Sequence, residues 1–231
     1  QKDLGDDDLL TIFNEENKQD LLKGSLDLLA KIQRLPQEEI PKLTHEELVD
    51  QMHLFKDIFC INFLEVEPDN SIDDLMLLTT ENIKQQPWVN CHFDFERRNL
   101  ILHQNQITVI DHQDMKIGPL GIDLSGILID HYYPVNLTDI NMMLDYFSKQ
   151  IKSKHSPEEL FNFLKWGSIQ RNMRILGTLA NLFTEHKRSF RLKDLPMILS
   201  NLECMIPDNH KSRFFISEQL KPLLNKKLSD I

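Results

Sequence analysis

The sequence predicts a mainly α-helical domain with a small β-hairpin in its middle. Apolar residues recur at helical spacing over most of the chain, and several of these stretches begin with capping signals. Near residue 100 the pattern changes to short segments rich in Val, Ile and Leu. The sequence shows no internal repeat and no low-complexity linker, so one domain is expected over residues 1–231.

Three amphipathic helices are predicted before residue 87. The first carries a stripe of leucines and isoleucines that stops at Pro36, because proline cannot continue a helix. Thr44 and Glu47 form a T-x-x-E capping box at the start of the second helix, and Ser71 with Asp74 marks the start of the third. The expected bounds are residues 11–35, 44 to about 63, and 71–86.

Three short strands are predicted next. The segments Trp88–His92, Asn99–His103 and Gln106–Asp111 are rich in residues that favour strands. The turn-like pair Gln104-Asn105 separates the second segment from the third. These two strands are therefore expected to form a hairpin.

Helices return from Gly121 onward. The best marked begins at Ser156, which is followed by a proline at the first helical position and by the capping-box residue Glu159. This helix is expected to run to about His186. Two later helices are predicted over residues 192–205 and 211–224, and each of these regions contains or adjoins a proline that starts or bends the helix.

The composition argues against several classes of partner. With a net charge of −10, the chain lacks the excess of Lys and Arg with which proteins bind nucleic acids or anionic membranes, so neither partner is expected. No apolar run is long enough to span a bilayer, and the first residues are acidic, unlike an export signal. The three cysteines are widely spaced, with no CxxC pair. A cytoplasmic protein is therefore expected.

One stretch carries the pattern of a catalytic site. Residues 92–99 read H-x-D-x-x-x-x-N, and the predicted hairpin that begins at Asn99 ends at Asp111. Phosphoryl transfer from ATP needs a group that accepts the proton of the substrate hydroxyl, and it needs oxygen ligands for magnesium. Because a hairpin returns the chain to its origin, Asn99 and Asp111 can converge on one metal ion while Asp94 lies a loop's width away.

Two other interpretations of this stretch stay open. In the first, His92 is a core histidine, and Asp94 and Asn99 only stabilise turns. In the second, Cys91, His92, His103 and His112 form a zinc cluster. The zinc reading is the weaker one, because the spacings match no usual zinc site and alternate strand residues point to opposite faces.

These residues resemble a known family. The segment from His92 to Asn99 resembles the catalytic loop of the aminoglycoside phosphotransferase and choline kinase superfamily, and Ile110–Asp114 resembles its I-D-F-x-D metal-binding segment. Residues 118–125 are similar to its G-P-x-x-Y-D-L-A signature. Arg98-Asn99-Leu100 and residues 170–177 are similar to segments of the bacterial anomeric N-acetylmuramate and N-acetylglucosamine kinases. The resemblance extends from Asp3 to about Phe183.

The resemblance implies a role for each matching residue. It implies that Asp94 is the catalytic base and that Asn99 and Asp111 bind magnesium, and with it ATP. His92 is implied to brace the catalytic loop, and Asp123 to hold the backbone of that loop.

Three further residues are candidates for substrate contacts. They are Arg98, Asp114 and Arg171. Asp114 could equally be a helix or turn cap, and an arginine near buried acids is more often part of a structural ion pair. Two positions depart from the family pattern, where His112 replaces an aromatic residue and Ile122 replaces a tyrosine.

The resemblance covers only part of a kinase. It implies the C-terminal lobe of the protein-kinase-like fold, in which residues 1–10 follow the hinge and residues 88–114 hold the catalytic loop and the metal-binding hairpin. The sequence has seven glycines and no G-x-G-x-x-G array or similar loop that would cover the phosphates. The N-terminal lobe is therefore expected to be missing, and to be supplied by the same polypeptide or by another one.

The expected function is ATP- and magnesium-dependent phosphoryl transfer to a hydroxyl of a small molecule. The resemblance implies a sugar acceptor, the anomeric hydroxyl of N-acetylmuramate or N-acetylglucosamine, in cell-wall recycling. An aminoglycoside or choline-type kinase is one alternative. A non-catalytic binding module is the other alternative. Residues 1–231 by themselves are expected to be inactive without an N-terminal lobe.

Overall fold

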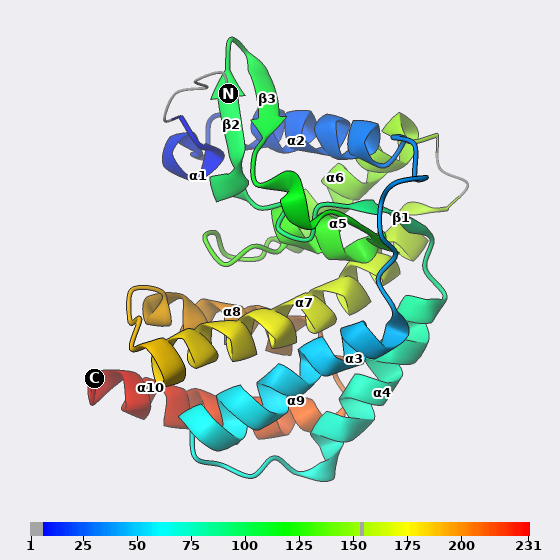
Figure 1. The fold of residues 1–231 in the computed structure, drawn as a ribbon. Coiled ribbons are helices and arrows are strands. Elements are labelled where there is room, and N and C mark those ends of the chain that lie inside the picture. Colours follow the sequence, from blue (N-terminus) through cyan, green and yellow to red (C-terminus); the bar gives the residue numbers. More distant parts are fainter. Residues whose placement is uncertain (1–6, 153–154) are drawn as a thin grey trace. The chain divides into compact units, whose positions relative to one another are not determined.

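A computed structural model describes residues 7–152 and 155–231 (Figure 1). The chain divides into two compact units, one formed by Gln1–Leu43 and Gln86–Gly167 and the other by Thr44–Gln85 and Ser168–Ile231. Both are rich in helix, and the strands belong to the first unit, so the expectation of a mainly helical chain is confirmed. The part of residues 1–10 that precedes Asp7 lies outside the described residues.

The first unit begins with two helices where one was predicted. Helix α1 spans Leu9–Ile12 and α2 spans Lys18–Ile32. Between them, the side chains of Asn14 and Asn17 each accept a hydrogen bond from the other's backbone N–H, at 3.1 and 2.9 Å. Such side-chain bonds compete with helical backbone bonds and so break the helix. The predicted helix over residues 11–35 was therefore wrong in its first turns.

Two small antiparallel sheets follow. Strand β1, Trp88–Cys91, pairs with β4, Lys116–Pro119, and β2, Leu100–His103, pairs with β3, Gln106–Val109. The β2–β3 hairpin confirms the prediction, and its turn residues adopt left-handed conformations. Strand β4 was not predicted, because it is short and contains a glycine and a proline, which are uncommon in strands.

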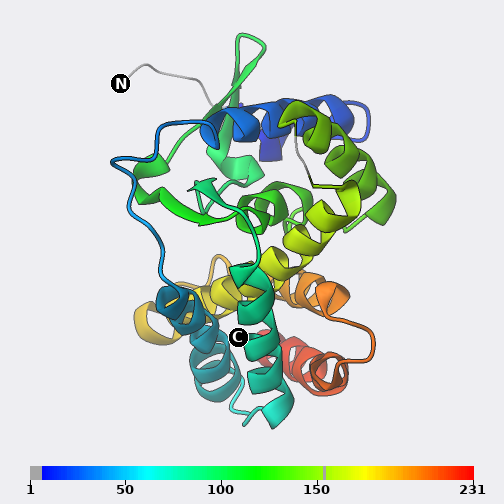
Figure 2. The ribbon, with the colours of Figure 1, turned by 90° about the vertical axis from the view of Figure 1, so that its right-hand side faces the viewer.

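Helices α5 and α6 complete the first unit together with the start of α7. Helix α5, Gly121–Leu128, is almost entirely buried, and α6, Leu137–Gln150, lies against α2 (Figures 1 and 2). Helix α7 spans Pro157–His186, and its first turn has the predicted capping box, in which Ser156 and Glu159 bond reciprocally. A Cβ atom on Gly167 would lie 2.3 Å from the backbone of Gly121, so α7 and α5 are in backbone contact.

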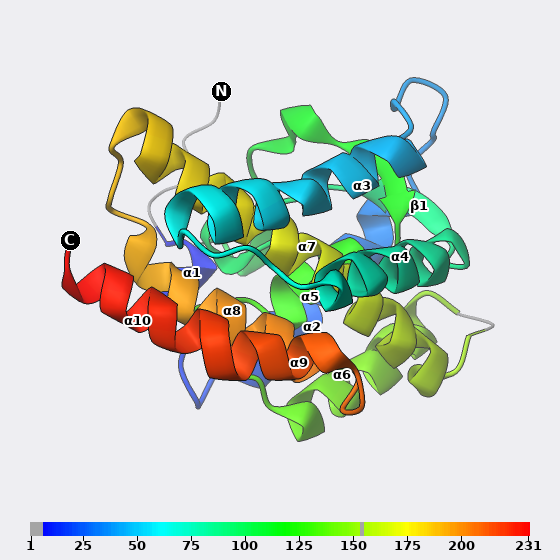
Figure 3. The same cartoon turned by 90° about the horizontal axis from the view of Figure 1, so that it is seen from below.

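The second unit is a set of helices (Figure 3). The capping box of Thr44 and Glu47 is present and begins α3, His45–Leu54, which continues as a π-helical segment, Phe55–Phe63. The predicted second helix is thus confirmed. The other helices of this unit are α4 (Asn70–Lys84), the remainder of α7, α8 (Leu195–Met205), α9 (Lys211–Phe215), a π-helical segment (Ile216–Leu220) and α10 (Lys221–Ser229).

A membrane span was also sought among the described helices. In residues 7–152 and 155–231, every helix is too short or too polar to cross a bilayer.

Glycines at two helix contacts give a paired test of the packing. A Cβ atom on Gly177 in α7 would lie 2.4 Å from the backbone of Leu54, which cannot move away alone. A Cβ atom on Gly24 in α2 would meet only the side chain of Ile107, whose terminal methyl would lie 2.8 Å away.

We expect Gly177→Ala to lower the free energy of unfolding by about 2 kcal/mol, because overpacking exceeds the gain in helix propensity. Gly24→Ala is expected to change it by less than about 1 kcal/mol in either direction, because a side-chain methyl can shift. Urea unfolding followed by circular dichroism measures both variants. Equal effects of the two substitutions would contradict the packing described here.

Candidate functional site

Asp94 lies in a loop whose backbone is hydrogen-bonded to a residue of α5. The loop follows β1, and both oxygens of the Asp123 carboxylate on α5 accept backbone hydrogen bonds from it, from His92 N at 2.6 Å and from Phe93 N at 2.9 Å. Asp123 is buried, so these bonds form away from water, where unsatisfied polar groups are costly. The loop therefore has a fixed start, two residues before Asp94.

Phe93 adopts an unusual backbone conformation at this point. Its φ is 69°, in the left-handed region that a bulky residue rarely occupies. The Phe93 ring lies over Gly118 in β4, where a Cβ atom would come within 2.6 Å of it. The pairing of β1 with β4 and the absence of a side chain at Gly118 thus make room for the conformation that presents Asp94.

Asn99 is tied to Asp94 through the backbone. Its side-chain Nδ2 donates to the carbonyl oxygen of Asp94 at 2.8 Å, and Asn99 N donates to Glu96 O at 2.9 Å. Asn99 is buried. Since its Nδ2 is the donor in this bond, Oδ1 is the atom with which the side chain can accept a hydrogen bond or bind a cation. The carboxylate of Asp94 is half-buried.

The hairpin brings Asp111 back to this loop. Ile110 N donates to Asn99 O at 3.0 Å, and His92 Nε2 lies 2.9 Å from Ile110 O. Since a carbonyl can only accept, Nε2 of His92 carries the proton. The residue before Asp111 is therefore bonded both to the loop's first residue and to its last.

Asp111 itself is exposed and has a left-handed backbone, with φ of 64°. One of its carboxylate oxygens accepts a hydrogen bond from Gln113 Nε2 at 2.6 Å. A non-glycine residue in this region is uncommon, although aspartate tolerates it better than most, and such positions cluster at functional sites. His112 and Asp114 are also exposed, in the short 3-10 helix His112–Asp114.

Asn99 and Asp111 fit a magnesium ion by the chemistry of their donors. Both offer oxygen ligands, and magnesium is usually held by one or two protein groups together with water and substrate phosphates.

The cluster of Cys91, His92, His103 and His112 is a separate question. Among residues 7–152 and 155–231, no group of three or more His, Cys, Asp and Glu side chains gathers in a metal-binding arrangement. Burial also raises the pKa of the Cys91 thiol well above its usual value, so Cys91 remains protonated.

The three candidate substrate residues are not all in one unit. Arg98 and Asp114 belong to the first unit with Asp94, whereas Arg171 belongs to the second, where it is a fully buried residue of α7. Arg98 forms an ion pair with Glu96. Burial by itself would lower the pKa of Arg98, but the carboxylates of Glu96 and Asp94 outweigh burial and raise it above its ordinary value.

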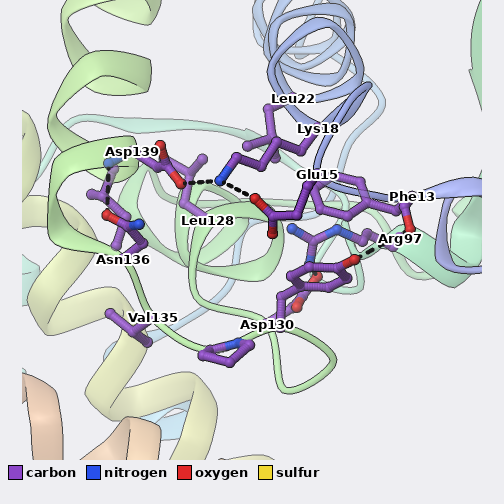
Figure 4. Close-up of a pocket in the computed structure, with 13 residues that line it drawn as sticks. Phe13, Glu15, Lys18, Leu22, Arg97, Leu128, Asp130, Val135, Asn136 and Asp139 are labelled. Atoms are coloured by element: carbon purple, nitrogen blue, oxygen red, sulfur yellow. Dashed lines mark hydrogen bonds and ion pairs between the residues drawn. The ribbon is translucent and has the colours of Figure 1, made fainter.

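Sequence reasoning missed the neighbouring arginine. Arg97 is buried, forms an ion pair with Asp130, and lies over the rings of Phe13 and Tyr133, at 4.0 and 5.3 Å from the ring centroids (Figure 4). Burial lowers its pKa to about 10, so the guanidinium is still charged at neutral pH. No local signal marks Arg97, because Asp130 lies 33 residues away in the sequence.

Arg97 lines a cavity of about 250 Å³ within the first unit (Figure 4). In the lining of this cavity, Lys18 Nζ lies between carboxylate oxygens of Glu15 and Asp139, each at 2.9 Å. Hydrogen bonds to Glu15 and Asp139 raise the pKa of Lys18. Aliphatic residues complete the wall, and they are Leu22, Leu128, Pro134, Val135 and Ile140.

Known proteins with similar sequences are sugar kinases. The chain is 24% identical to the N-acetylmuramate/N-acetylglucosamine kinase of Neisseria meningitidis over 87% of this chain and 64% of that protein. It is 24% identical to the enzyme of the same name from Pseudomonas aeruginosa over 88% of this chain and 63% of that protein. The chain thus spans less than two thirds of the length of these relatives.

Solved structures with a similar fold are also kinases. An ethanolamine kinase from Plasmodium vivax matches with a TM-score of 0.62 and 14% identity, over 92% of this chain and 65% of that one. The ADP-bound aminoglycoside phosphotransferase APH(2'')-Ib matches with a TM-score of 0.50 and 14% identity, over 90% of this chain and 72% of that one. At such identities these likenesses concern the fold alone.

A sequence model of the phosphotransferase enzyme family matches residues 6–140, which include Asp94, Asn99, Asp111 and Asp123. The match covers more than half of the chain. The resemblance of the catalytic loop is therefore confirmed at the level of the family, and the chain belongs to the phosphotransferase enzyme family.

Proposed function

We propose that the protein transfers a phosphoryl group from ATP, with magnesium, to a hydroxyl of a small molecule. One observation carries this proposal. The backbone and side-chain bonds that join His92, Asn99 and Ile110 hold Asp94, Asn99 and Asp111 around one loop, although 16 residues lie between the two aspartates. A loop with only a structural role would not need two acidic residues in accessible positions beside a bonded asparagine.

Each residue of this loop has a proposed role. Asp94 is proposed to accept the proton of the acceptor hydroxyl, because it is only half-buried and its backbone is held by Asn99. Asn99 and Asp111 hold the magnesium ion, which neutralises charge on the phosphates of ATP when bound. His92 and Asp123 position the loop through the bonds described above.

The acceptor proposed is an amino sugar, at its anomeric hydroxyl, as part of cell-wall recycling in the cytoplasm. The names of the relatives and the likeness of residues 98–100 and 170–177 to such kinases support this proposal. Arg98 and Asp114 are proposed to contact the acceptor or a phosphate, whereas Arg171, fully buried in the second unit, is given no such role. The Arg98–Glu96 pair fits a mainly structural role for Arg98 equally well.

The groups that cover the phosphates of ATP are proposed to come from an N-terminal lobe, with these residues forming the C-terminal lobe. Residues 1–231 contain no glycine-rich array of the kind that wraps a nucleotide. The lobe would belong to the same polypeptide or to a partner. The same observation favours a second candidate function, a kinase-like module that binds a ligand without catalysis.

The roles of the two aspartates can be separated in the protein assembled with its N-terminal lobe. Asp94→Asn is expected to lower kcat by roughly 100- to 10,000-fold with little change in the affinity for magnesium-ATP, because the base acts on the acceptor. Asp111→Asn is expected to weaken the binding of magnesium-ATP. Steady-state kinetics and nucleotide titration measure both, with the exposed Asp145→Asn as control. A near-native rate for Asp94→Asn would show that another group is the base.

The contribution of the Asp123 hydrogen bonds to the loop can be tested without a substrate. Asp123→Asn replaces one acceptor oxygen by an NH₂ group, which faces a backbone N–H, so we expect a loss of about 1–3 kcal/mol in the free energy of unfolding. Hydrogen exchange at the amides of His92 and Phe93 should become faster, whereas Asp145→Asn should leave it unchanged. Unchanged exchange in Asp123→Asn would mean that the loop is held by other contacts.

A panel of acceptors tests the proposed substrate. N-acetylglucosamine and N-acetylmuramate are expected to give higher kcat/KM than kanamycin, choline and ethanolamine, because the relatives with matching sequence act on these sugars by name. Coupled measurement of ADP release ranks the compounds. A preference for an aminoglycoside or an amino alcohol would refute the amino-sugar assignment and leave the phosphotransferase assignment in place.

A further inference from the structure

We propose that the cavity beside Arg97 binds the ring of the acceptor and selects a neutral, polyhydroxylated sugar over one that carries a carboxylate. The inference rests on the proposed function, because it takes the acceptor to be a sugar, and it adds where the sugar lies and which sugar is preferred. It is carried by the position of the cavity, by its size and lining, and by its charge.

The position of the cavity links it to the catalytic loop. Arg97 follows Asp94 by three residues in a tight turn, in which Glu96 N donates to Asp94 O at 2.9 Å. Asp130 and Tyr133 line the cavity together with Arg97, and Arg97 lies in the loop that runs from His92 to Asn99. A ligand in the cavity would therefore lie beside the loop that carries Asp94.

The size and the lining suit one sugar ring. A volume of about 250 Å³ is below the usual range for drug-sized ligands, roughly 300–1,000 Å³, and is too small to enclose an aminoglycoside of several rings. One side of the cavity offers carboxylate oxygens of Glu15 and Asp139, which can accept hydrogen bonds from hydroxyl groups. The aliphatic wall, including Leu128 and Val135, can pack against the apolar face of a ring.

The charges of the lining disfavour an anion. Its two cationic side chains, Lys18 and Arg97, are both paired with carboxylates, and the three carboxylates leave the lining with a net charge of −1. An anionic ligand would have to replace Glu15, Asp130 or Asp139 at a cation, at the cost of an unpaired carboxylate. N-acetylglucosamine is neutral at pH 7, whereas N-acetylmuramate carries a lactyl carboxylate, so the neutral sugar is favoured.

The proposed location of the sugar is tested by a substitution that fills the cavity. Val135→Trp is expected to weaken the binding of N-acetylglucosamine at least tenfold, because the indole occupies the space of the ring. Leu137→Trp is the matched control, since Leu137 is exposed, lies two residues away and does not line this cavity. Binding is followed by NMR titration of the sugar into the protein, with circular dichroism to compare folding. Equal affinities for the two variants would overturn the proposed location.

The test of selectivity uses a variant that carries little risk to folding. The side chain of Glu15 is 74% exposed, so Glu15→Gln removes one negative charge from the lining without disturbing the core. The native protein is expected to bind N-acetylglucosamine more tightly than N-acetylmuramate, and Glu15→Gln should narrow that ratio by about threefold, as expected for one partly screened charge. Glu16→Gln, which lies outside the cavity, should leave the ratio unchanged. A native preference for N-acetylmuramate, or an equal effect of both variants, would overturn the selectivity.

Turnover separates this inference from the proposed function. In the protein with its N-terminal lobe, Val135→Trp should raise KM for the sugar and leave KM for ATP unchanged. If the native protein phosphorylates N-acetylglucosamine and Val135→Trp leaves KM for the sugar unaltered, the cavity assignment is wrong and the kinase assignment stands. If the sugar binds in the cavity and no transfer occurs, the kinase assignment is wrong and the cavity remains a sugar site.

Discussion

The geometry of the proposed catalytic loop depends on one buried carboxylate. Asp123 accepts the backbone N–H groups of His92 and Phe93, and it lies on α5, which is almost entirely enclosed by the first unit. A buried carboxylate is costly unless its oxygens are hydrogen-bonded, and buried N–H groups are costly unless they find acceptors. Each side of this contact therefore satisfies the other, and the bond to Phe93 is made with that residue in its left-handed conformation.

The two proposed magnesium ligands are held by backbone bonds. Asn99 donates to the carbonyl of Asp94, and the residue before Asp111 bonds to Asn99 and to His92. Asp111 is exposed, and one of its carboxylate oxygens accepts a hydrogen bond from Gln113. Both side chains are thus positioned through the backbone beside them, as the proposed magnesium site requires.

Two adjacent arginines show how burial separates the roles of similar residues. Arg98 is partly exposed and pairs with the nearby Glu96, whereas Arg97 is enclosed by Asp130 and two aromatic rings. Arg97 lines the cavity. Because its charge is paired with Asp130, Arg97 is a poor receptor for an anion. The same pairing connects that cavity to the loop that contains Asp94.

The sequence by itself determined the helical class, the β2–β3 hairpin and the membership of the phosphotransferase enzyme family. These features depend on local signals, such as the capping boxes at Thr44 and Ser156 and the spacing of Asp94 from Asn99, which the chain carries within a few residues. Only the tertiary structure decided the pairing of β1 with β4, the burial of Arg97 against Asp130 and the cavity beside them. Each of these joins residues far apart in the chain, and their pairing depends on which groups the fold brings together and removes from water, which local spacing does not encode.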